Sequence, residues 1–128
     1  MSVEFYPIVI DVPDLGIASA RLQRSAAPLT VKAIYQLIQG KPFASRARWN
    51  DQAKQDAIVF EIGIQKGKEG KPGKLRPNEI GYSFGIDSVI VQVGEATIDA
   101  VRIGEIKENL DMFKNLKNGM SIKLKLSK

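Results

Sequence analysis

The sequence of 128 residues contains no histidine and no cysteine. Without them the chain cannot build a Ser-His-Asp or Cys-His nucleophile pair, because the base or the nucleophile is missing. A zinc site of the usual kind is excluded as well, since it needs imidazole or thiolate ligands, and so is a disulfide framework. The composition therefore favours binding over catalysis. We expect no catalytic residue, no metal and no cofactor.

Long apolar segments are also missing. The longest apolar runs are only a few residues, too short to cross a bilayer. The N-terminal sequence MSVEFYPIVIDVP lacks a basic region followed by a long apolar one, which predicts no signal peptide. With 44% hydrophobic and 26% charged residues the composition is that of an ordinary globular protein. We expect a single cytoplasmic domain over residues 1–128, without a membrane partner.

The net charge of +5 is concentrated in one segment. Lys66–Arg76 holds five basic residues and one acid, and therefore accounts for four of the five net positive charges. The surrounding stretch, residues 66–78, has three glycines, two prolines and no apolar periodicity, which predicts a flexible basic loop. Nucleic-acid binding usually needs a broad basic face with stacking aromatic residues. This loop has no aromatic residue, so a nucleic-acid partner is not favoured.

Short segments of alternating hydrophobicity dominate the rest of the chain. Pro7 cannot donate a backbone hydrogen bond, which predicts that the first of these strands is an edge strand or begins near Pro7. Many short strands with regular turns favour a closed or nearly closed antiparallel barrel of about eight strands with two helices, and an open α+β sandwich is the alternative. The predicted strands include residues 5–12, 17–24, 45–51, 57–65, 88–93, 97–106 and 120–126.

Two helices are predicted from their capping signals. The first begins at Pro28, presents a stripe that includes Leu29, and ends at Gly40. The second runs over Leu110–Lys117 with Asn109 as its N-cap. Both are short enough to cover the open ends of a barrel.

The segment Ser45–Asp51 carries the main candidate site. In a strand, Ala47 and Trp49 would face the core, while Arg46 and Arg48 would lie together on the opposite face. Their fork-shaped donors suit a carboxylate, a phosphate or a peptide carbonyl. The alternative is a solvated strand face, on which each arginine covers apolar surface with its stem.

A second pair of candidates is Tyr82 and Phe84. They lie two residues apart between Gly81 and Gly85, hence on one side of an extended segment. They are predicted either to form the aromatic wall of a ligand groove or to plug the mouth of the barrel.

The order of several short motifs resembles that of the cyclophilin-like domain family of small prokaryotic proteins. The matching segments lie between Ala26 and Leu126 and include TVKAIY from Thr30, ARWND from Ala47, IVFEI from Ile58, EIGY from Glu79, SVIV from Ser88, IGEI from Ile103 and NLDMF from Asn109. The resemblance implies a compact cyclophilin-type barrel with a groove on its outer surface. Where the family often has an aromatic-proline loop after Gly-Tyr, this chain has Ser83-Phe84-Gly85-Ile86. The resemblance does not imply isomerase activity, because this chain has no Phe-His-Arg strand and no Gln-Gly-Gly-Asp segment.

The sequence therefore predicts a binding module for a peptide or small-molecule ligand in an outer groove edged by Arg46, Arg48, Tyr82 and Phe84. One alternative is peptidyl-prolyl cis-trans isomerisation, in which an arginine polarises the prolyl nitrogen and no covalent step is needed. A second alternative is polyanion or nucleic-acid binding through the lysine loop of residues 66–76.

Overall fold

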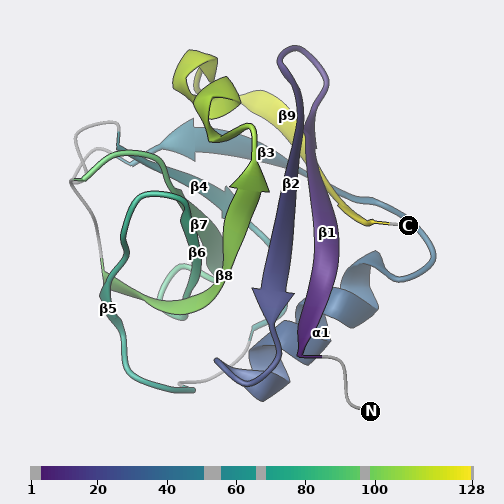
Figure 1. The fold of residues 1–128 in the computed structure, drawn as a ribbon, viewed down its shortest axis with the longest axis vertical. Helices are drawn as coiled ribbons and strands as arrows, with labels where there is room; N and C mark the ends of the chain where they lie inside the picture. Colours follow the sequence, from purple (N-terminus) through teal and green to yellow (C-terminus); the bar gives the residue numbers. More distant parts are fainter. Residues whose placement is uncertain (1–3, 51–55, 66–68, 96–98, 128) are drawn as a thin grey trace.

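The computed structural model describes residues 4–50, 56–65, 69–95 and 99–127. Within these ranges the chain is mainly strand, with one α-helix and one 3₁₀ helix (Figure 1). The strands are β1 (Phe5–Val12), β2 (Gly16–Gln23), β3 (Phe43–Trp49), β4 (Ala57–Glu61), β5 (Gly73–Lys74), β6 (Glu79–Ser83), β7 (Ser88–Gln92), β8 (Asp99–Glu108) and β9 (Met120–Leu126). The helices are α1 (Pro28–Ile38) and η1 (Leu110–Asn115).

Eight of these strands form a closed antiparallel barrel, as the sequence predicts, and not an open sandwich. Their order is β2-β1-β9-β3-β4-β7-β6-β8, and β2 then pairs with β8 to close the ring. The short β5 adds to the outside of β8. Closure depends on a close approach at Gly104, where a Cβ atom would collide with the Arg21 carbonyl oxygen. Glycine is therefore required where β2 meets β8.

Pro7 does not mark a sheet edge, because β1 lies between β2 and β9. This corrects the edge-strand prediction. The ladder between β1 and β9 begins at Ile8, one residue after the proline. The Pro7 carbonyl points toward the end of β9 and accepts a hydrogen bond from Ser127 N at 3.1 Å. Pro7 thus lies outside the β1–β9 ladder, where its missing N–H interrupts none of the pairs from Ile8 to Asp11.

Helix α1 begins at Pro28 and is followed by Gly40, which has a φ of 94°. Its buried side chains are Thr30, Val31, Ile34 and Ile38. Leu29, placed in the buried stripe by the sequence, is 65% exposed. Ile34 and Ile38 of the predicted stripe are buried, and the placement of Leu29 in that stripe is wrong.

The second helix is a 3₁₀ helix, Leu110–Asn115, and is shorter than the predicted helix Leu110–Lys117. Asn109 adopts a left-handed conformation with φ 70° and makes no side-chain cap. Its amide instead donates to the Ile17 carbonyl at 3.0 Å, which ties η1 to the first hairpin. Figure 1 shows α1 and η1 near opposite ends of the barrel.

A second small apolar cluster lies outside the barrel. The side chains of β4 and β7 that do not face the main core pack with Leu75, which is 4% exposed. Leu75 belongs to the basic loop, whose described part, residues 69–78, also contributes β5 to the sheet. The predicted basic loop thus has one apolar anchor, Leu75. The cluster consists of Ala57, Val59, Leu75, Ile90 and Ala100.

No helix in the described part of the chain is long and apolar enough to cross a membrane.

Candidate functional site

Strand β3 presents two chemically different faces. Ala47 is 1% exposed, and Trp49 is half-buried against the core. The indole of Trp49 donates to the Leu116 carbonyl at 2.6 Å, so the ring is held as part of the structure. Arg46 and Arg48 point to the opposite, exposed face, as the alternation predicts.

The two arginines line one hollow of about 570 Å³ on the outside of the barrel. Its floor is Val59, which is 1% exposed and directly opposite Arg48 in the β3–β4 ladder. The residues around the hollow, which we call the Arg48 groove, come from β3, β4 and the turn before β7. They are Arg46, Arg48, Val59, Glu61, Gln65, Gly85, Ile86, Asp87 and Ser88.

The charged side chains of the Arg48 groove differ in how they are engaged. Arg46 donates from Nη1 to the Gly119 carbonyl at 2.9 Å. Arg48 and Glu61, both exposed, have no side-chain hydrogen bond or ion pair to any described residue. The groove thus holds one cation and one carboxylate that the described protein leaves to solvent.

Asp87, in the wall of the groove, accepts three hydrogen bonds from neighbouring residues. Its Oδ1 accepts from Tyr82 Oη at 2.6 Å, from Gln65 N at 3.0 Å and from Ile64 N at 3.2 Å. Its backbone has a φ of 48°, an uncommon conformation that these bonds support. Asp87 therefore joins the segment after β4 to the turn before β7.

Of the two arrangements predicted for Tyr82 and Phe84, the structure does not have the aromatic wall of the Arg48 groove. Tyr82 is 1% exposed and belongs to the interior of the barrel, while Phe84 packs partly buried against the same core. Their rings meet edge to face, with centroids 5.5 Å apart. The reason is the register of β6, in which Ile80 and Tyr82 both fall on the inner face. Tyr82 is connected to the groove wall through its hydroxyl bond to Asp87.

Glu61 and Asp87 are site residues that the sequence predictions did not select. A signal existed for Glu61, because it alternates with Ile58, Phe60 and Ile62 and must face outward with Val59. No comparable signal marks Asp87, whose role depends on a turn conformation and on partners in two other segments.

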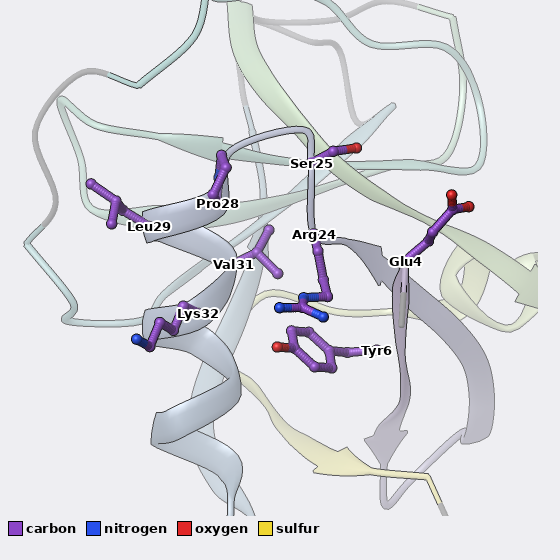
Figure 2. A pocket seen from close by; sticks show the side chains of 8 residues that line it. All are labelled: Glu4, Tyr6, Arg24, Ser25, Pro28, Leu29, Val31 and Lys32. Carbon is purple, nitrogen blue, oxygen red and sulfur yellow. The ribbon is translucent and has the colours of Figure 1, made fainter. Parts of the chain in front are cut away.

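A second hollow of about 540 Å³ lies between β1, the end of β2 and the first turns of α1. Figure 2 shows the Arg24 guanidinium next to the Tyr6 ring, and Leu29 and Lys32 projecting from α1. Arg24 lies 5.3 Å from the Tyr6 ring centroid, and Tyr6 also stacks on Tyr35 at 4.1 Å. The principal aromatic and cationic groups here are thus engaged with one another.

A third hollow, of about 550 Å³, lies beside Trp49. Lys114 on its rim forms an ion pair with Asp111 at 3.2 Å. Lys117 and Asn118 also line it, and Asn118 accepts from Trp49 N at 2.8 Å. The Asn118 bond connects the segment after η1 to β3, and the described residues around this hollow give no second pair of unengaged opposite charges.

A network of ion pairs lies where the barrel closes, away from the groove. Glu105 accepts from Arg21 Nε at 2.8 Å, and Arg102 donates from Nε to Glu79 at 2.6 Å. The Arg21 hydrogen bond and the positive charges of Arg21, Lys107 and Arg102 hold the pKa of Glu105 below its ordinary range, against the opposing effect of burial. This network stabilises the seam between β2, β8 and β6.

The described residues offer no group of three His, Cys, Asp or Glu side chains that could hold a metal ion. In the basic loop, Lys71, Lys74 and Arg76 are exposed. Lys66 and Lys68, which belong to the same predicted patch, lie outside the described residues.

No protein-family model and no curated protein sequence matches the chain. Among solved structures, its fold is similar to that of the hypothetical protein AF2241 from Archaeoglobus fulgidus, with a TM-score of 0.76, 18% sequence identity and 98% of each chain covered. It is also similar to McbB, solved in complex with tryptophan, with a TM-score of 0.77 and 12% identity. That match covers 94% of this chain and 44% of McbB. At these identities the similarity establishes a shared fold.

Proposed function

We propose that the chain is a binding module that takes a peptide or small-molecule ligand in the Arg48 groove and holds a carboxylate of that ligand on Arg48. One observation carries the proposal. Arg48 stands in a hollow above the apolar floor of Val59, and its guanidinium has no partner among the described residues. A guanidinium can make two parallel, charge-assisted hydrogen bonds to a carboxylate, which are stronger than neutral ones.

The surroundings of Arg48 suit a small ligand with an apolar part. Ile86 on the rim is 44% exposed, so it can cover apolar atoms that rest on Val59. Arg46 adds a second positive charge while its bond to the Gly119 carbonyl holds it in place. The volume of about 570 Å³ falls in the range of small-molecule sites, about 300–1,000 Å³.

Two further arguments support this proposal. McbB, 44% of which is covered by the similarity to this fold, was solved in complex with tryptophan, a small ligand that carries a carboxylate. The resemblance of the motif order to the cyclophilin-like domain family also favours a ligand on the outer surface of the barrel. We extend the proposal to membership of that family, without an isomerase activity.

The test is a titration of the ¹⁵N-labelled chain followed by amide chemical shifts. The probes are 4-methylpentanoate and a proline-containing tetrapeptide with a free C-terminus. We expect saturable shifts for the amides of Arg48, Val59, Glu61 and Ile86, and the loss of these shifts in Arg48→Ala. Arg76→Ala is the matched control, because Arg76 is exposed and lies outside the groove. Shifts confined to the hollow around Tyr6 and Lys32 would contradict the proposal.

A further inference from the structure

The Arg48 groove contains two basic and two acidic side chains. One of each makes hydrogen bonds within the described protein, and the other does not. Arg46 is bound to the Gly119 carbonyl, and Asp87 accepts three hydrogen bonds through Oδ1. Arg48 and Glu61 remain unengaged among the described residues. A ligand that enters this groove therefore meets one available cation and one available carboxylate.

The positions of these two side chains are fixed by the strands. Arg48 lies opposite Val59 in the β3–β4 ladder, and Glu61 is two residues further along β4 on the same face. Such diagonal neighbours have Cα atoms about 7–8 Å apart. The Ser45 hydroxyl donates to the Glu61 carbonyl at 2.8 Å and holds this end of β4 beside β3. Arg48 and Glu61 form no ion pair with each other within the described structure, although they line the same hollow.

Apolar surface lies close to this separated pair. Val59 forms the floor, and it belongs to the outer apolar cluster together with Leu75 of the basic loop and Ile90 of β7. Ile86 is one of three large apolar side chains of the described chain that remain strongly exposed. Burying the exposed part of Ile86 under a ligand would be favourable, because the stabilisation grows with the apolar area removed from water.

From these contacts we infer that the ligand is a free α-amino acid with an apolar side chain. Its carboxylate binds Arg48, its ammonium group binds Glu61, and its side chain covers Val59 and Ile86. A peptide C-terminus has no ammonium group beside its carboxylate and leaves Glu61 without a counter-charge. This inference rests on the proposed function and narrows it to one class of ligand.

The test compares three ligands of similar shape by isothermal titration calorimetry at pH 7. The ligands are L-leucine, 4-methylpentanoate, which lacks the ammonium group, and 3-methylbutylamine, which lacks the carboxylate. Because each charged group adds a charge-assisted hydrogen bond, L-leucine should bind about tenfold more tightly than either analogue. The inference is overturned if 4-methylpentanoate binds as tightly as L-leucine.

Two variants distinguish this inference from the proposed function. Glu61→Gln should weaken L-leucine binding to the level of 4-methylpentanoate while the affinity for 4-methylpentanoate does not fall. Glu108→Gln, an exposed position outside the groove, is the matched control and should leave both affinities unchanged. If Arg48→Gln weakens both carboxylate ligands and Glu61→Gln weakens neither, the amino-acid inference fails and the binding proposal stands. If no probe binds, or Arg48→Gln has no effect, both fail.

Discussion

Glu69 accepts two hydrogen bonds from Thr30 at 2.8 Å, one from the backbone N–H and one from the hydroxyl, across 39 residues of sequence. A third bond at 2.8 Å comes from Leu29 N. These donors belong to the first turn of α1, whose backbone N–H groups have no partner within the helix. The one acid of the segment Lys66–Arg76 therefore caps a helix that precedes it in the chain.

Replacing this cap should lower stability measurably. Glu69→Ala removes an acceptor of three hydrogen bonds and a negative charge at a helix N-terminus, which should reduce the free energy of unfolding by about 1–2 kcal/mol. Urea denaturation measures this loss. In a double-mutant cycle, Thr30→Ala and Glu69→Ala together should cost less than the sum of the single changes. Additive costs would show that the two side chains do not interact in solution.

The apolar anchor of the same loop is open to a separate test. Leu75→Ala should destabilise the chain by about 2 kcal/mol or more, because it empties a buried site against Val59 and Ile90. It should also speed tryptic cleavage after Lys74, identified by fragment mass. Lys71 and Arg76 both precede proline and resist trypsin, so Lys74 reports on the described loop. Equal cleavage in both proteins would mean that Leu75 does not hold the loop.

Tyr82 is expected to support the fold and not to contact ligand. Tyr82→Phe removes the bond to Asp87 Oδ1 and should lower the free energy of unfolding by about 1 kcal/mol. Affinity for a carboxylate ligand should stay within about twofold, since Asp87 keeps its two backbone donors. Thermal unfolding and calorimetry on the same sample separate the two effects. A large loss of affinity without a loss of stability would place Tyr82 in the site after all.

The lowered pKa of Glu105 should make the free energy of unfolding depend on pH. Its pKa lies below the ordinary value of 4.5, mainly through the Arg21 hydrogen bond. A depressed pKa in the folded state stabilises the fold above the ordinary value, and this contribution is lost as the pH falls through the folded-state pKa. Glu105→Gln should therefore be less stable than the natural chain at pH 7. The difference should shrink as the pH drops below 4.5. A difference that is constant with pH would contradict this account.

The barrel could be predicted from the sequence because its strands alternate so regularly. The outward placement of Arg46 and Arg48 follows from the same alternation, which any antiparallel register preserves. Tyr82 could not be placed this way, because the sequence does not say which face of β6 turns inward. The edge-strand prediction from Pro7 was wrong for a related reason. In sequence, a proline just outside the β1–β9 ladder looks the same as a proline in an edge strand.

The contacts of the basic loop could not be predicted from the sequence, for a different reason. Glu69 and Leu75 act on partners that lie far away in the chain, and only the closed barrel brings these partners near. A composition rich in lysine, glycine and proline predicts a solvated loop. It takes one buried leucine and one capping carboxylate to fix such a segment on the surface.

The most direct test of the proposed site is the dissociation constant of 4-methylpentanoate for the natural chain, Arg48→Ala and Arg76→Ala, from amide shifts at Val59 and Ile86. We predict weaker binding by about tenfold or more in Arg48→Ala, because a charge-assisted pair of hydrogen bonds is lost. Binding to Arg76→Ala should match the natural chain. Equal affinity in all three proteins would contradict carboxylate recognition by Arg48.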